Sequence, residues 1–222
     1  SLLLDKFSVT KKDIIKDELV WAFENFDIFW FRLGFEIDKK LLNIDKRRVS
    51  VIVCPVTGLN HIDIEECEKN GIEIISLKGE VDFLKEVTAT AELTIGLTLA
   101  LLRKIPKSIN SVKDNKWDRD LFRGYEIKDK NVGIIGLGRL GSIVGSYFSS
   151  FGAKVYGYDI NKVKSNTIIQ LKSLNELLNK SDIITIHVDL NESTYHMFNK
   201  KMFEQIKDNC ILINTSRGEI IE

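Results

Sequence analysis

Short apolar runs alternate with amphipathic segments along almost the whole chain. Most of the apolar runs are continuous, which is the pattern of strands that are covered on both faces. Strands of this kind alternating with helices are typical of a parallel α/β fold. The pattern predicts strands at residues 26–31, 49–54, 72–76, 131–135, 154–158, 183–188 and 210–214, and helices at 11–24, 62–70, 87–104, 139–151, 174–180 and 200–206.

The predicted elements fall into two successive sets, one at residues 1–84 and the other at 85–222. A long apolar helix lies near the junction and includes residues 92–103. A helix this apolar is expected to be buried on most sides, either between domains or against a second subunit. We therefore predict two α/β domains and a homodimer that forms through the 92–103 region.

Composition excludes several classes of function. The chain has 32 basic and 32 acidic residues and no basic block, so a nucleic-acid partner is not expected. Its longest apolar stretch, at about 95–102, is too short to cross a bilayer, so no membrane association is expected. The first residues lack a basic segment followed by a long apolar core, and they predict no signal peptide.

The three cysteines are Cys54, Cys67 and Cys210, and their wide spacing does not match a metal-binding pattern. Cys54 and Cys210 lie in apolar, strand-like runs, so they are predicted to be small buried residues. We expect no metal site and a reducing, cytoplasmic environment.

The most informative motif combines Gly136, Gly138 and Gly141 in the spacing G-x-G-x-x-G, directly after the predicted strand 131–135. The first glycine permits a tight turn, the second lets the backbone approach a pyrophosphate, and the third lets the helix pack closely on the sheet. The positive end of the following helix suits an anionic phosphate. The buried face of that helix is predicted to consist of Leu140, Ile143, Val144, Tyr147, Phe148 and Phe151.

Asp159 directly follows the next predicted strand, at 154–158, and lies 21 residues after Gly138. This is close to the spacing of about 20 residues at which a carboxylate binds the ribose of a dinucleotide. A carboxylate there accepts hydrogen bonds from ribose hydroxyls and repels a 2′-phosphate, so the motif favours NAD over NADP. The alternative is a glycine-rich turn in an ordinary α/β domain.

Further motifs before and after the glycine turn narrow the interpretation. Glu92 lies in Ala-Glu-Leu-Thr at the long helix, His187 lies in Ile-His-Val-Asp-Leu, and Arg217 lies in Asn-Thr-Ser-Arg-Gly. This succession resembles the D-isomer-specific 2-hydroxyacid dehydrogenases, a group that includes D-3-phosphoglycerate and D-lactate dehydrogenases and glyoxylate/hydroxypyruvate reductases. The resemblance implies a Rossmann-type NAD-binding domain at 85–222 and a smaller flavodoxin-like substrate domain at 1–84, with the C-terminal part missing.

The resemblance also implies where the substrate binds. Arg217 follows a strand end, and its guanidinium fork would bind the carboxylate of a 2-oxo acid and polarise its carbonyl. Backbone N–H groups at Thr57 and Gly58 would hold the same carboxylate, with the substrate in a cleft between the domains. The alternatives are an arginine that caps a loop and a simple strand-to-helix turn. His61 is given no catalytic role.

Histidine is the usual proton donor near neutral pH, but His187 is not assigned that role, since it matches a cofactor-side position in the related enzymes. We therefore expect it to have a structural role beside the cofactor. The cofactor-binding residues implied by the motifs and the resemblance are Gly136, Gly138, Arg139, Leu140, Gly141, Asp159, His187, Val188, Thr194, Thr215 and Ser216.

Related enzymes also use a glutamate and a histidine that follow the arginine in sequence, and no counterpart follows Arg217 here. We therefore predict a fragment of an NAD-dependent enzyme that interconverts a small 2-oxo acid and its D-2-hydroxy acid. A non-catalytic NAD-binding sensor or scaffold of the same fold is the alternative. Oxidation of formate or phosphite is a third possibility.

Overall fold

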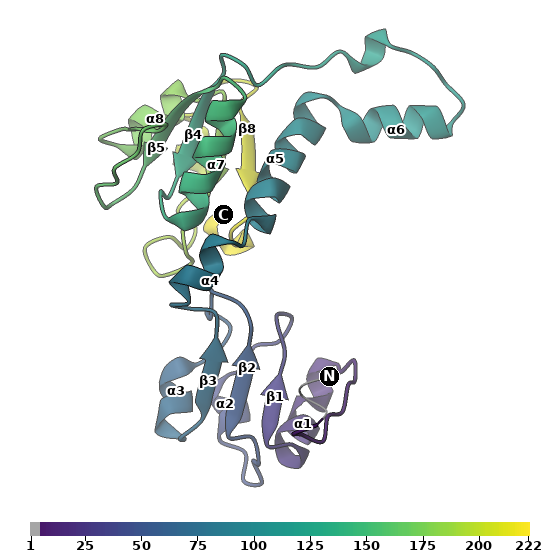
Figure 1. The fold of residues 1–222 in the computed structure, drawn as a ribbon, viewed down its shortest axis with the longest axis vertical. Coiled ribbons are helices and arrows are strands. Elements are labelled where there is room, and N and C mark those ends of the chain that lie inside the picture. The colour runs from purple at the N-terminus through teal and green to yellow at the C-terminus, as the bar shows by residue number, and fades with distance from the viewer. Residues whose placement is uncertain (1–4) are drawn as a thin grey trace. The chain divides into compact units, whose positions relative to one another are not determined.

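A computed structural model describes residues 5–222 of the chain (Figure 1). Its contacts divide the chain into two compact units, Ser1–Glu80 and Val81–Glu222. The division falls four residues before the boundary expected after residue 84. The two units are called unit 1 and unit 2 below, and each is described separately.

Unit 1 contains a parallel sheet of three strands in the order β1-β2-β3. The strands are β1 (Ile28–Trp30), β2 (Val51–Cys54) and β3 (Glu73–Ser76), and each lies within a predicted segment. Side chains alternate between the two faces. One face is buried and includes Phe29 and Ile52, which are neighbours across the sheet and belong to the core of unit 1.

The helices of unit 1 are α1 (Leu19–Asn25), α2 (Lys39–Leu42) and α3 (Ile64–Lys69), with a 3₁₀ turn at Lys16–Glu18. The side chain of Asp38 caps α2 and that of Asp63 caps α3, each by accepting a backbone N–H. The prediction of a helix from residue 11 was wrong for its first five residues. The Glu18 carboxylate instead accepts the N–H of Ile15, and the helical segment begins after that residue.

The second face of the unit 1 sheet is apolar and open within the described part of that unit. Trp30 and Ile75 occupy this face at matching positions and are 56% and 49% exposed, with the half-buried Val53 between them. Parallel sheets are normally covered on both faces.

Unit 2 contains a parallel sheet of five strands in the order β6-β5-β4-β7-β8. Strands β4 (Asn131–Ile135) and β5 (Lys154–Tyr158) have the predicted bounds. β7 (Ile183–Ile186) ends two residues earlier than predicted, and β8 (Ile211–Asn214) begins one residue later. Strand β6 (Ile169–Gln170) was not predicted, because two residues are too few to form a recognisable pattern.

Helices cover both faces of the unit 2 sheet. One core cluster joins β4 with α5 (Ala89–Leu102) and α7 (Arg139–Ser150), and it contains Phe148. The other joins β7 with α8 (Leu174–Lys180), and it contains Phe198. Short helical segments complete the unit: α4 (Val81–Lys85), α9 (Lys200–Phe203), and 3₁₀ turns at Asp120–Phe122 and Gly218–Ile220.

A helix that was not predicted, α6 (Ile105–Lys113), follows α5 and runs outward from the sheet (Figure 1). The break between the two helices lies at Lys104, whose φ of 53° is left-handed. Pro106 is in the first turn of α6, a favoured place for proline and a signal that could have marked the new helix. The chain returns at Tyr125, whose N–H donates to the carbonyl of Leu102 at 3.0 Å.

Within unit 2, the long apolar helix α5 is buried on one face only, so its burial against a second domain or subunit stays a prediction. One face of α5 is buried and includes Thr94 and Thr98, both fully inaccessible. The other face exposes Leu93, Leu97 and Leu101, which are 54%, 41% and 54% exposed.

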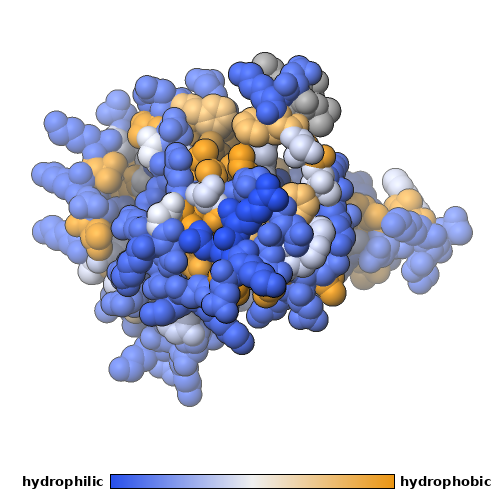
Figure 2. All heavy atoms as spheres, turned by 90° about the horizontal axis from the view of Figure 1, so that it is seen from below, coloured by the Kyte–Doolittle hydropathy of each residue, from blue (hydrophilic) through white to orange (hydrophobic). Residues whose placement is uncertain are grey.

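The three cysteines are unpaired. The prediction that Cys54 and Cys210 are buried is correct for Cys54 and wrong for Cys210, which is half-buried. In residues 5–222 no helix has the length and hydropathy of a membrane span. The same residues contain no group of three or more potential metal ligands. On the face drawn in Figure 2, hydrophilic side chains predominate and apolar ones form smaller patches between them.

Candidate functional site

The carboxyl ends of the five parallel strands of unit 2 meet at one edge of its sheet. Gly136 follows β4, Asp159 follows β5, His187 follows β7 and Thr215 follows β8. The sheet thus brings together four predicted site residues that are up to 79 positions apart in sequence. In open α/β sheets, ligands bind at this edge.

The glycine turn is shaped by contacts that exclude side chains at two of its three glycines. Gly136 has a φ of 90°, and a Cβ there would lie 2.8 Å from the backbone carbon and oxygen of His187. A Cβ on Gly141 would collide with the carbonyl oxygen of Gly136. The turn is therefore closed against both the end of β7 and the start of α7.

Gly138 differs from the other two glycines, because no heavy atom lies within 4 Å of a Cβ built on it. It is exposed and forms the N-cap of α7, with no side chain capping the first turn. The first N–H groups of a helix lack intrahelical partners and bind anions. This open backbone has the shape and the donors that a dinucleotide pyrophosphate requires.

Arg139 is the first residue of α7, and its Nη1 donates to two backbone carbonyls of unit 2. The acceptors are the oxygens of Leu84, at 2.8 Å, and Val87, at 2.7 Å. The guanidinium thus ties the glycine turn to the end of α4. Leu140 is half-buried and packs against the core beside α7.

Asp159 is half-buried, and both of its carboxylate oxygens accept backbone hydrogen bonds. Leu137 of the glycine turn donates to Oδ2 at 2.7 Å, and Asn161 donates to Oδ1 at 2.8 Å. The amide of Gln170 donates to the carbonyl of Asn161 at 2.7 Å and so fixes the loop after Asp159. No pattern in the sequence indicates this role for Gln170, because the residue lies in the unpredicted strand β6.

The imidazole of His187 is mostly buried, and its Nε2 lies 2.8 Å from the hydroxyl oxygen of Thr185. Burial lowers the pKa of His187 to about 4. The ring is therefore neutral at physiological pH and is a poor proton donor. The backbone N–H of His187 donates to Ile135 at 2.7 Å, which holds the end of β7 against β4.

Two other predicted cofactor residues follow His187. Val188 lies against the glycine turn, with its Cγ1 2.9 Å from a Cβ built on Gly136. The Thr194 hydroxyl donates to the carbonyl of Asp189 at 2.6 Å and accepts the N–H of Asn191 at 2.8 Å. Thr194 therefore closes the loop that leaves β7.

The turn after β8 is organised by the side chain of Asn214. Its Oδ1 accepts from both the N–H and the hydroxyl of Ser216, at 3.0 and 2.7 Å, and its Nδ2 donates to the carbonyl of Arg217 at 2.8 Å. Arg217 is half-buried, and its Nη1 lies 3.1 Å from the carbonyl of Ser216. The turn that carries Arg217 is thus fixed by the residue that ends the strand.

In unit 1, the predicted substrate turn lies between β2 and α3. Thr57 is exposed and Gly58 is half-buried. Just after the turn, His61 Nε2 lies 3.4 Å from the Cys54 thiol. Burial raises the pKa of that thiol, so Cys54 is not an activated nucleophile.

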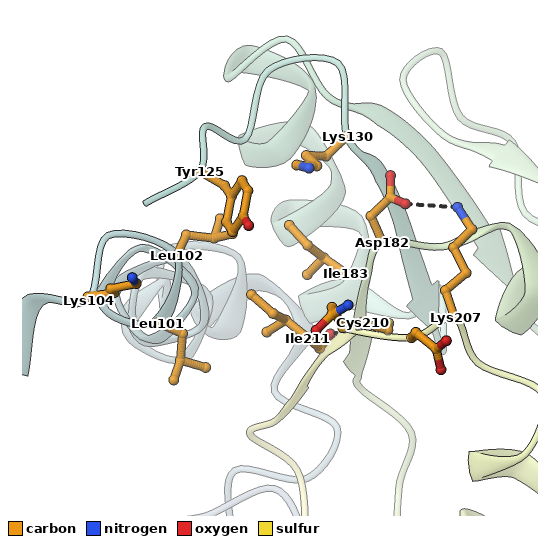
Figure 3. Close-up of a pocket in the computed structure, with 12 residues that line it drawn as sticks. Leu101, Leu102, Lys104, Tyr125, Lys130, Asp182, Ile183, Lys207, Cys210 and Ile211 are labelled. Atoms are coloured by element: carbon orange, nitrogen blue, oxygen red, sulfur yellow. Dashed lines mark hydrogen bonds and ion pairs between the residues drawn. The ribbon is translucent and has the colours of Figure 1, made fainter. Parts of the chain in front are cut away.

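A hollow of about 510 Å³ lies at the opposite, amino-terminal edge of the unit 2 sheet, near the starts of β7 and β8 (Figure 3). Asp182 and Lys207 form an ion pair there, with Nζ and Oδ1 2.8 Å apart. Burial alone would raise the pKa of Asp182, but hydrogen bonds from Lys207 and the N–H of Asn131 outweigh it, and the pKa is lowered. None of the predicted site residues lines this hollow.

Comparison with known proteins decides which family these features represent. The family model described as "D-isomer specific 2-hydroxyacid dehydrogenase, NAD binding domain" matches residues 95–222. The chain belongs to this family. Unit 2 is accordingly its NAD-binding domain, of the Rossmann type, and the family predicted from the sequence is confirmed.

Relatives in the D-2-hydroxyacid dehydrogenase family match along most of the chain. A hydroxypyruvate reductase of Thermotoga maritima is 31% identical over all of this chain and 71% of its own length. A glyoxylate reductase of Thermofilum pendens is 33% identical over 93% of the chain and 62% of its own length. Other curated relatives are longer, and the chain spans 40% of a matching D-3-phosphoglycerate dehydrogenase.

Among solved structures, a D-lactate dehydrogenase of Aquifex aeolicus, complexed with NAD and lactic acid, has a TM-score of 0.77. It is 29% identical and is covered over 60% of its length by 91% of this chain. The match supports NAD as the cofactor of the domain, as the sequence predicted.

Proposed function

We propose that the whole protein is an NAD-dependent oxidoreductase that interconverts a small 2-oxo acid and its D-2-hydroxy acid. The observation that carries this proposal is the arrangement at the carboxyl edge of unit 2. There, an NAD-binding domain of the family combines the open backbone at Gly138, the carboxylate of Asp159 and the turn of Arg217.

The dinucleotide would be bound by backbone groups more than by side chains. The N–H groups at the start of α7 hold the pyrophosphate, and Gly138 lets it approach. The Asp159 carboxylate accepts hydrogen bonds from the adenosine ribose while it continues to brace the turn through Leu137. Thr215 and Ser216 line the nicotinamide half, with His187 neutral beside it.

The substrate would be oriented by Arg217. Its planar guanidinium forms paired hydrogen bonds with a carboxylate and draws electron density from the adjacent carbonyl. When bound, NADH supplies the hydride for that carbonyl carbon. Asn214 donates a hydrogen bond to the backbone carbonyl of Arg217, so the backbone that carries the guanidinium is held in place. In unit 1, Thr57 and Gly58 remain proposed donors to the substrate carboxylate.

The test of the proposed function is turnover by the full-length protein. We expect NADH to be oxidised with at least one of glyoxylate, hydroxypyruvate, pyruvate and phosphohydroxypyruvate, as followed by NADH absorbance. Formate and phosphite should be tested with NAD in the oxidative direction. Tight NADH binding without turnover of any substrate would contradict the enzyme and would favour a non-catalytic sensor or scaffold.

Asp159→Asn is expected to raise affinity for NADPH relative to NADH by about 10-fold. The amide oxygen still accepts the N–H of Leu137, while the hydrogen bond from Asn161 is lost. The amide no longer repels a 2′-phosphate, and such a charge contact is worth about 1–2 kcal/mol. Fluorescence titration with both cofactors measures the ratio. Asp208→Asn, at an exposed carboxylate near the opposite sheet edge, should leave the ratio unchanged.

A homodimer is the proposed assembly, and an apolar surface on α5 and α6 supports it. Leu93, Leu97 and Leu101 are exposed on α5, as are Ile109 and Val112 on α6. Exposed apolar side chains repeated at helical spacing are typical of interaction sites. Leu97→Lys should convert the dimer to a monomer in sedimentation velocity, whereas Ile169→Lys, at an exposed position on β6, should not. A dimer that survives the charge at position 97 would contradict this interface.

The proposed location is the cytoplasm. The three cysteines are free, and the two in unit 1 are buried, as is common in reducing compartments. Fractionation of cells that produce the full-length protein tests this location.

A further inference from the structure

A pair of threonines joins helix α5 to the turn after β8. Thr94 is fully buried in α5, and its Oγ1 lies 2.9 Å from the Oγ1 of Thr215, which directly follows the last residue of β8. The residues are 121 positions apart in sequence. The same Thr94 oxygen lies 2.9 Å from the carbonyl oxygen of Thr90, one helical turn earlier. This buried hydroxyl therefore touches two other oxygens.

Counting protons gives the direction of both hydrogen bonds. Two oxygens at this distance need a proton between them, and each hydroxyl has one proton to give. The carbonyl of Thr90 has none, so the proton of Thr94 lies on that contact. The contact between Thr94 and Thr215 must then be filled by the proton of Thr215. Thr215 donates inward, and only its lone pairs remain for a ligand.

We propose that Thr94 is a positioning residue, which fixes the Thr215 hydroxyl as a hydrogen-bond acceptor for the carboxamide NH₂ of the nicotinamide ring. The assignment rests on the proposed function, since it takes Thr215 to line the nicotinamide half of the cofactor. The carboxamide offers both an N–H donor and a carbonyl acceptor. A hydroxyl that is restricted to accepting selects the NH₂ group and so sets the orientation of the ring.

The neighbouring hydrogen bonds leave the Thr94–Thr215 contact separate. Thr98 donates its hydroxyl proton to the carbonyl of Thr94 at 2.8 Å, so it bonds the backbone of α5 and neither of the two paired hydroxyls. On the other side of Thr215, Asn214 holds Ser216 and Arg217. Thr94 therefore bonds Thr215, the residue of this turn that the Asn214 side chain does not bond.

The experiment compares binding of three ligands to the full-length protein: NAD, 3-acetylpyridine adenine dinucleotide and ADP-ribose. The acetylpyridine analogue has a methyl group in place of the NH₂, and ADP-ribose lacks the ring. A single neutral hydrogen bond predicts that the wild-type protein prefers NAD to the analogue by about 3- to 10-fold. Thr94→Val, which keeps the branched shape without the hydroxyl, should reduce this preference to nearly 1.

Two further variants separate positioning from general structural damage. Thr94→Ser keeps the hydroxyl and should restore the preference for NAD. Thr98→Val removes a buried hydroxyl from the same helix without touching Thr215, and it should lower the melting temperature but keep the preference. ADP-ribose should bind equally to every folded variant. If Thr94→Val does not fold, Thr215→Val removes the acceptor that Thr94 orients and should lose the preference in its place.

The outcomes distinguish this assignment from the proposed function. Unchanged preference in Thr94→Val, or equal weakening of NAD and ADP-ribose, would overturn the role of Thr94 while leaving the dinucleotide site in place. A wild-type protein that binds neither NAD nor ADP-ribose would overturn the proposed function itself, and this assignment with it.

Discussion

Gly138→Ala is expected to weaken NADH binding on the order of 100-fold while leaving the protein as stable as before. The new methyl group meets no protein atom within 4 Å, but it occupies the backbone surface where the pyrophosphate is proposed to lie. Loss of one or two charge-assisted hydrogen bonds accounts for an effect on the order of 100-fold. The φ of −65° at this position suits alanine, so the free energy of unfolding should rise slightly if it changes at all.

Gly141→Ala is the matched comparison, because it is expected to impair both binding and stability. Its Cβ collides with the carbonyl oxygen of Gly136, so the turn must open. We expect a loss of about 1–3 kcal/mol in the free energy of unfolding, as for other overpacked sites. Gly96→Ala, in an open position on α5, controls for the gain in helix propensity.

Urea unfolding and NADH fluorescence titration together measure both glycine variants. Normal NADH affinity in Gly138→Ala would contradict a pyrophosphate at this turn. Equal stability losses in Gly138→Ala and Gly141→Ala would contradict the different steric surroundings of the two glycines.

Arg217→Lys is expected to lower kcat/KM of the full-length enzyme by about 100- to 1,000-fold, as removal of one group that stabilises developing charge does elsewhere. Lysine keeps the charge but cannot form the planar pair of hydrogen bonds with a carboxylate. The dissociation constant of NADH should stay within about twofold of the wild-type value, since the guanidinium is assigned to the substrate and an effect of this size is below about 0.5 kcal/mol.

Steady-state kinetics with the best 2-oxo acid, combined with NADH titration, separate these two effects. Arg123→Lys is a suitable control, because Arg123 is exposed and pairs with Asp120 at 2.8 Å, outside the proposed site. A weakened NADH affinity with unchanged turnover of bound substrate would assign Arg217 to the cofactor instead.

The sequence predicted the strands of both units well, because their continuous apolar runs are long enough to be distinctive. The bounds of β4 and β5 match the prediction, whereas β6, with two residues, was missed. Helices α2, α4 and α6 were also missed, since α2 and α4 are short and α6 is mostly polar. The face of α5 that is buried could not be predicted, because apolar side chains lie on all sides of that helix.

The candidate site could be predicted only as far as its motifs extend. The glycine turn and Asp159 have a fixed spacing in sequence, so local pattern was enough to find them. Thr94 and Gln170 act through partners that only the fold brings close, and neither residue type is unusual where it stands. The hydrogen bonds of Arg139 to the end of α4 could not be predicted either, because every residue has a backbone carbonyl and no residue type indicates which one is the acceptor.

The hydrogen bonds of Arg139 connect residues 84–87 to the glycine turn. The Nη1 group of Arg139 donates to the carbonyls of both Leu84 and Val87, near the start of unit 2. The guanidinium has three further N–H groups, and we propose that a phosphate at the glycine turn accepts from them. Filling of the glycine turn would then hold Arg139 in place and, through it, the end of α4. Slower amide hydrogen exchange at residues 84–88 on addition of NADH would report this coupling.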